Sequence, residues 1–108
     1  MTKKTSVLLV ERDADLRRSV AVALNSAGYA VDAVATAAEA EMRLAHPRYE
    51  ALISEWRIST ATGGYVLLAP PQQATHHKLL TKPIPPAELV DALERLMDGP
   101  TASRMVVE

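Results

Sequence analysis

Three short apolar runs, each followed by charged residues, constrain the fold more than any other feature of this chain. They are residues 7–10 before Glu11, residues 51–54 before Glu55, and residues 78–81 before Lys82. Continuous apolar runs of this length are typical of strands buried on both faces of a sheet. Charges at the C-terminal ends of such strands lie at the edge where open α/β sheets keep their active sites. Any one run could be an ordinary strand end that meets solvent, but all three in this order predict one shared site.

The first half of the chain alternates strand and helix patterns. Strands are expected at residues 5–10, 29–34 and 49–55, and amphipathic helices at residues 14–27 and 37–45. Asp13 and Thr36 are suited to cap the two helices at their starts, and Gly28 suits the left-handed turn after the first helix. The order β-α-β-α-β predicts a parallel sheet with right-handed crossovers.

The second half departs from this alternation. Residues 57–64 are polar and end in two glycines, which indicates a turn, and residues 72–77 are too few for a normal helix. Strands are expected at residues 65–69 and 79–81. A strong helix is expected to open at Pro85-Pro86 and to close at Gly99-Pro100. Residues 1–100 are therefore expected to form one domain, and residues 101–108 a tail that is either frayed or a small pairing strand.

Composition narrows the possible partners. The chain has 108 residues, 12 basic and 13 acidic, and a formal net charge of −1. This balance gives no electrostatic case for nucleic acid or an anionic membrane as a partner. The absence of Cys excludes a disulfide frame and a thiolate site, and it is consistent with the cytoplasm, which is the expected location. The apolar run near the N-terminus is too short for a signal peptide or a membrane span.

Residues 5–97 resemble the receiver domain of bacterial two-component response regulators. Glu11, Arg12 and Asp13 stand where that family has its acidic cluster, Glu55 stands at the phosphoacceptor position, Gly63 fits a later glycine, and Lys82-Pro83 matches the family's lysine and its usually cis proline. The resemblance implies a flavodoxin-like α/β fold, with a parallel sheet in the order 2-1-3-4-5 and five helices.

The departures from the family pattern affect its chemistry. Arg12 replaces a carboxylate that the family uses to hold a divalent metal, and a guanidinium cannot bind a cation. Glu55 is longer than Asp by one methylene, and Ala69 stands at the position of the strand-four hydroxyl. We therefore expect a degenerate receiver without metal or cofactor, in which Glu55 pairs with Arg12, Lys82 or both. Two alternatives stay open. Glu55 and Arg12 point to water without pairing, or the metal and phosphate chemistry of the family survives in this chain.

The chain is also shorter than a receiver after its third and fourth strands. The family's third and fourth helices are expected to be missing or much reduced, which would uncover one face of the last three strands. Burying a few hundred Å² of bare apolar sheet is expected to stabilise the protein by several kcal/mol, at about 25 cal/mol per Å². We expect a homodimer to cover this face. A partner protein and the tail of residues 101–108 are the alternatives. Alternatively, the connection is too short to keep the fourth strand parallel.

Together, these expectations predict a protein that functions by binding other proteins. The chain is expected to act in signal transduction through protein contact, without enzyme activity and without phosphorylation, on a second copy, a regulatory protein or a kinase. One alternative is a working response regulator that a histidine kinase phosphorylates. Another is a small α/β enzyme, which the lack of a glycine-rich cofactor loop and of a nucleophile–base pair disfavours.

Overall fold

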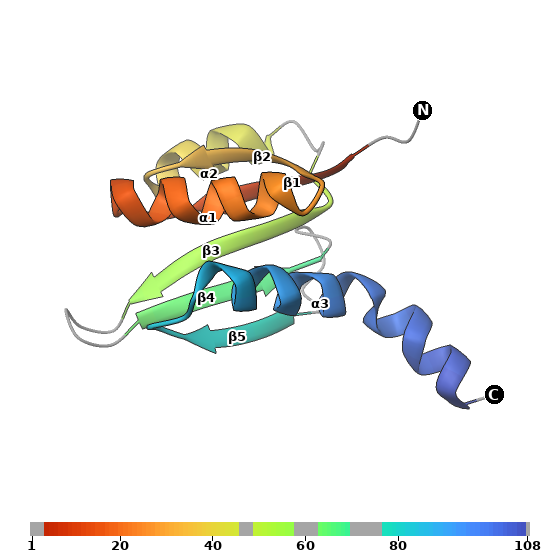
Figure 1. The fold of residues 1–108 in the computed structure, drawn as a ribbon. Coiled ribbons are helices and arrows are strands. Elements are labelled where there is room, and N and C mark those ends of the chain that lie inside the picture. The colour runs from red at the N-terminus through yellow and green to blue at the C-terminus, as the bar shows by residue number, and fades with distance from the viewer. Residues whose placement is uncertain (1–3, 46–48, 58–62, 70–76, 108) are drawn as a thin grey trace.

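A computed structural model describes residues 4–45, 49–57, 63–69 and 77–107 of the chain, with the backbone alone for residues 57, 77 and 98–107. The elements are, in chain order, β1 (Thr5–Val10), α1 (Ala14–Ser26), β2 (Tyr29–Val34), α2 (Ala37–Leu44), β3 (Ala51–Arg57), β4 (Gly63–Leu68), β5 (His77–Thr81) and α3 (Pro86–Val107) (Figure 1). The helix α3 extends to Val107, past the Gly99-Pro100 pair at which the sequence predicted its end. None of the helices so described is long and apolar enough to cross a membrane.

The local signals at the starts of the first two helices are confirmed. The Asp13 side chain accepts a hydrogen bond from the Leu16 N–H at 3.0 Å, and Thr36 accepts one from the Glu39 N–H at 3.2 Å. These side chains satisfy backbone donors that have no partner inside the helix. Gly28 follows α1 with φ of 101°, a conformation that favours glycine.

The five strands lie in the order β2-β1-β3-β4-β5, as predicted. The prediction that all of them are parallel is wrong, because β4 runs antiparallel to both β3 and β5, and the sheet is mixed. The cause is the length of the connection. Parallel neighbours need a crossover of about a dozen residues or more, whereas only residues 58–62 separate β3 from β4. The alternative of a connection too short for a parallel strand is the one that the structure adopts.

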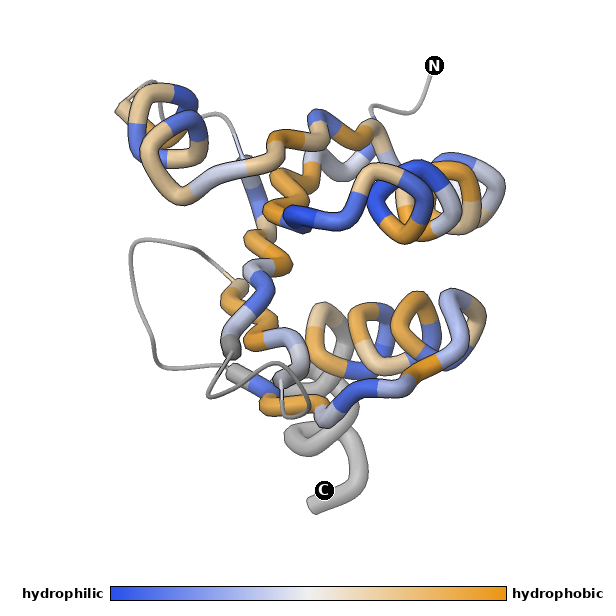
Figure 2. The backbone as a smooth tube through the Cα atoms, turned by 90° about the vertical axis from the view of Figure 1, so that its left-hand side faces the viewer, coloured by the Kyte–Doolittle hydropathy of each residue, from blue (hydrophilic) through white to orange (hydrophobic). Residues whose placement is uncertain are grey.

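The helices divide between the two faces of the sheet. Figure 2 shows α1 and α3 on one face and α2 on the other, beside the β1–β2 end. The larger core lies under α1 and α3 and includes Leu9, Ile53, Leu67, Leu24 and Leu89, all fully buried. A smaller core under α2 includes Leu8, Leu52 and Tyr49. Within the part of the chain that the structure describes, no helix covers the α2 side of β3, β4 and β5.

Candidate functional site

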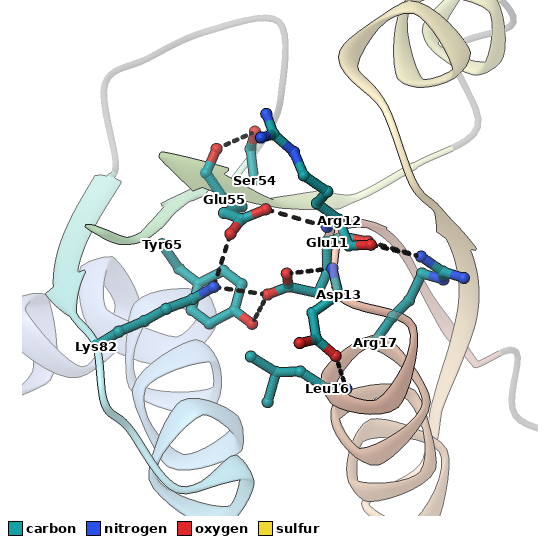
Figure 3. A network of polar contacts seen from close by, with 9 residues as sticks. All are labelled: Glu11, Arg12, Asp13, Leu16, Arg17, Ser54, Glu55, Tyr65 and Lys82. Carbon is teal, nitrogen blue, oxygen red and sulfur yellow. Dashed lines mark hydrogen bonds and ion pairs between the residues drawn. The ribbon is translucent and has the colours of Figure 1, made fainter. Parts of the chain in front are cut away.

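Strand alternation brings the site residues to one face of the sheet. In β1 and β3, the residues that face α1 and α3 include Leu9 and Ile53, and the next residues of the same parity are Glu11 and Glu55. The antiparallel register pairs Glu55 with Tyr65. Lys82 follows β5 and points toward the same place, so that side chains from four strand regions converge (Figure 3).

Lys82 lies at the centre of this cluster. Its Nζ is 2.9 Å from Oε1 of Glu11 and 2.8 Å from Oε2 of Glu55. The Lys82 side chain is 23% exposed, that of Glu55 is 9% exposed, and that of Glu11 is fully buried. The peptide bond from Lys82 to Pro83 is cis, as the resemblance implied, and the Lys82 N–H donates to the Gly63 carbonyl at 2.8 Å. One ammonium group thus bridges two carboxylates that are almost removed from water.

The buried Glu11 carboxylate has donors at both oxygens. Oε1 accepts from Lys82 and from the hydroxyl of Tyr65, and Oε2 accepts from the Asp13 N–H at 2.9 Å. A buried carboxylate is costly unless it is paired and hydrogen-bonded, and these three donors offset that cost. Arg17 supports the same turn from α1, because its Nη1 donates to the Glu11 carbonyl at 2.9 Å.

Glu55 is also engaged at both oxygens. Oε2 contacts Lys82, and Oε1 accepts from the backbone N–H of Arg12 at 3.0 Å. Of the two pairings predicted for Glu55, the one with Lys82 is present as an ion pair. The contact with Arg12 is made by its main chain, and Arg12 as a residue is exposed. Lys82 therefore supplies positive charge inside the site, in contact with both carboxylates.

Tyr65 is the site residue that sequence reasoning missed. Ala69 was predicted to end a parallel fourth strand at the site, but β4 is reversed and pairs Leu68 with Leu52, at the other end of β3. Ala69, which follows Leu68, therefore does not lie with Glu55. The hydroxyl group of the site comes instead from Tyr65. Gly63 and Gly64, expected in a turn, lie in β4 and pair with Arg57 and Trp56. The available signal was the short connection, because only residues 58–62 separate β3 from β4 and an antiparallel return places the next residues opposite the end of β3.

The pKa values of two groups follow from this geometry. Burial raises the pKa of Tyr65 well above its ordinary value of 10.0, and the hydrogen bond to Glu11 raises it further. Burial lowers the pKa of Lys82, but the hydrogen bonds to Glu55 and Glu11 outweigh burial and raise it above 10.5. At neutral pH, Tyr65 is therefore a neutral donor and Lys82 is a cation. A lysine held in this form is a poor general base and a poor nucleophile.

The residues present do not fit a divalent metal. Mg²⁺ requires near-octahedral oxygen ligands, and it is usually held by one or two carboxylates together with water. Here one oxygen of Glu11 and one of Glu55 contact Lys82, and the other oxygen of each accepts a backbone N–H. Oδ1 of Asp13 caps α1. Across the described ranges, no group of three or more His, Cys, Asp or Glu side chains is placed to hold a metal ion. Comparisons with protein-family models, with curated proteins and with solved structures gave no significant match.

Proposed function

We propose that this protein is a receiver-like module that works without phosphorylation and acts in signal transduction through protein contact. The observation that carries the proposal is the position of the Lys82 ammonium, within 2.9 Å of Glu11 and 2.8 Å of Glu55. The Lys82 cation balances the charge of both carboxylates, and Arg12 stands where the family has a carboxylate that would hold a metal ion beside it. The site then holds the ends of β1, β3 and β5 in one arrangement without a signal.

The same geometry disfavours phosphoryl transfer. That reaction depends almost wholly on placing the donor, the metal and an acceptor oxygen in line. Both oxygens of Glu55 are engaged by protein donors, and the side chain is 9% exposed. A displacement of about 1 Å can cost about a hundredfold in rate, and Glu55 reaches further than the Asp of the family pattern. The protonated Lys82 likewise gives no support to an enzyme that would use this lysine as its base.

A contact function needs a surface, and the α2 side of β3, β4 and β5 is the candidate. In this part of the structure, Trp56, Val66 and Leu68 are half-buried and Leu79 is 64% exposed. Trp56 and Leu79 lie on the face opposite Glu55, because neighbouring residues of a strand alternate. We propose a second copy of this chain as the partner, with the contact at the β5 end of the sheet, where Leu79 is exposed. A regulatory protein or a kinase would be the partner if the chain is monomeric.

Magnesium binding tests the proposed state of the site. Titration calorimetry with Mg²⁺ is expected to give no binding heat for the wild type at millimolar concentrations. The double variant Arg12→Asp with Glu55→Asp supplies the carboxylates of the family pattern and is expected to bind. Arg18→Asp with Glu94→Asp makes the same changes at exposed positions and is expected to behave as the wild type. Millimolar Mg²⁺ binding by the wild type would contradict the proposal.

A further inference from the structure

The outer edge of β5 is open in the described part of the sheet. β5 is the last strand in the order, and β4 pairs with it on one side. The Lys82 N–H points toward β4, where it donates to Gly63. Because backbone groups in an antiparallel pair alternate in direction, those of His77, Leu79 and Thr81 point to the outer edge. Such an edge is a template for another strand.

A groove of about 500 Å³ lies beside this edge, between β5 and α3. Its apolar lining is Leu80, Ile84, Ala92 and Leu96, and its charged lining is Lys78, Glu88, Asp91 and Arg95. The helix α3 begins just after β5 and runs back along it (Figure 1). Glu88, near the start of α3, therefore lies toward the end of β5, and Arg95 lies toward its beginning. The groove is acidic at one end and basic, through Lys78 and Arg95, at the other.

We propose that a second copy of this chain pairs with β5 edge to edge, antiparallel, about a two-fold axis at Leu79. The proposal rests on the homodimer proposed above and assigns its contact to the β5 edge. The sheet then continues from one copy into the other, and the open edge of each is closed by the other. The pairing uses the backbone groups of His77, Leu79 and Thr81, which form about six hydrogen bonds across the axis.

The side chains of β5 are complementary to themselves in this arrangement. Leu79, which is 64% exposed, meets Leu79 of the partner subunit on the face that carries no described helix there. On the other face, Lys78 lies opposite the partner's Leu80. No like charges stand directly opposite each other in the pairing, an arrangement that would be destabilising.

The charged ends of the two grooves also match. A two-fold axis at Leu79 brings the basic end of one groove to the acidic end of the other. Asp91 and Arg95 already pair with each other at 3.1 Å. Lys78 and Glu88 are both exposed and make no ion pair with any other residue that the structure describes. Lys78 is therefore available to the partner's Glu88, and this contact occurs twice in the dimer.

Charge reversal across the axis tests the proposal. Sedimentation over a concentration series is expected to show a wild-type dimer. Lys78→Glu and Glu88→Lys each create two like-charge contacts, and each is expected to raise the dissociation constant by more than about tenfold. An equimolar mixture of the two variants restores both contacts in a heterodimer, with an expected return to within about threefold of the wild type. Arg18→Glu and Glu41→Lys, at exposed positions on α1 and α2, are controls expected to dimerise normally.

The remaining possible results of this experiment each contradict part of the proposal. A wild-type monomer would overturn the homodimer and the edge pairing together, and would leave a different protein as the partner. A dimer that neither reversal weakens would overturn the edge pairing and leave the sheet face as the contact. Variants that stay monomeric when mixed would overturn the charge pairing between copies. The Mg²⁺ titration reports on the site independently, since Lys78 and Glu88 make no contact with Glu11 or Glu55.

Discussion

The hydroxyl of Tyr65 donates a hydrogen bond to Oε1 of Glu11, which joins β4 to the end of β1 across the intervening β3. This contact exists because β4 runs antiparallel, which places Tyr65 opposite Glu55. A parallel β4 would have carried its last residue to the site instead. The short connection between β3 and β4 therefore changes the direction of one strand and, with it, the composition of the site.

Removal of the Tyr65 hydroxyl is expected to destabilise the protein. Tyr65→Phe leaves the fully buried Glu11 with one donor fewer, and hydrogen bonds to charged groups contribute about 1.5–3 kcal/mol. Tyr49→Phe is the matched control, because Tyr49 donates to Asp32, whose side chain is 45% exposed and can bind water instead. Urea unfolding of both variants measures the difference. A loss for Tyr65→Phe no larger than that for Tyr49→Phe would contradict a buried role for this hydrogen bond.

Removal of the Lys82 charge is expected to lower the free energy of unfolding by more than removal of the Tyr65 hydroxyl does. Lys82→Met leaves the Glu11 and Glu55 carboxylates together without their cation, and breaking a buried pair in this way costs about 3 kcal/mol or more. Lys4→Met removes the same charge at an exposed position and is expected to change the free energy of unfolding by less than about 0.5 kcal/mol. Equal stabilities of the two variants would show that the ammonium does not hold the site together.

Stability is expected to fall in alkaline solution. The pKa of Tyr65 is raised above 10.0 and that of Lys82 above 10.5 in the folded state. The unfolded chain therefore releases these protons first, so the contribution of each group is complete below its ordinary pKa and is lost as the pH rises through the folded pKa. The slope is about 1.4 kcal/mol per pH unit for each group. The free energy of unfolding above pH 10 should fall less steeply for Tyr65→Phe, whereas identical slopes would contradict the assignment.

Gly64 is expected to tolerate no side chain. A Cβ there would lie 1.8 Å from the Leu80 carbonyl oxygen and 2.8 Å from the Trp56 ring. Gly64→Ala should therefore disturb the β4–β5 ladder and cost about 3 kcal/mol, at the upper end of overpacking effects. Gly28→Ala is the comparison, because its added Cβ meets no atom within 4 Å and only the positive φ opposes it, at about 1–2 kcal/mol. Thermal unfolding of the two variants compares their losses of stability. A larger loss for Gly28→Ala than for Gly64→Ala would contradict the close packing at Gly64.

Local sequence patterns predicted much of the fold. The strands β1 and β2 have the predicted bounds, and Asp13 and Thr36 cap the helices as predicted. These features depend on neighbouring residues, so a local pattern is sufficient to predict them. The convergence of Glu11, Glu55 and Lys82 was also predictable, because a charged residue lies near the C-terminal end of each of three strands that point the same way.

The direction of β4 could not be predicted from its own residues. Residues 63–68 are compatible with a strand of either direction, and the number of residues available for a crossover decides between them. Tyr65 was missed for this reason, and Ala69 was assigned to the site in its place. The sequence left open whether Arg12 or Lys82 pairs with Glu55. The structure places the Lys82 ammonium there, and the turn after β1 presents the Arg12 backbone N–H to Glu55.

The most direct test of the central claim is the intact mass of the protein after incubation with Mg²⁺ and a small phosphoryl donor, beside a response regulator known to be phosphorylated. Because Lys82 and the Arg12 N–H engage both oxygens of Glu55, we expect no added phosphoryl group on the wild type or on Glu55→Gln. A phosphoryl group gained by the wild type and absent from Glu55→Gln would contradict the claim and would make this protein a working response regulator.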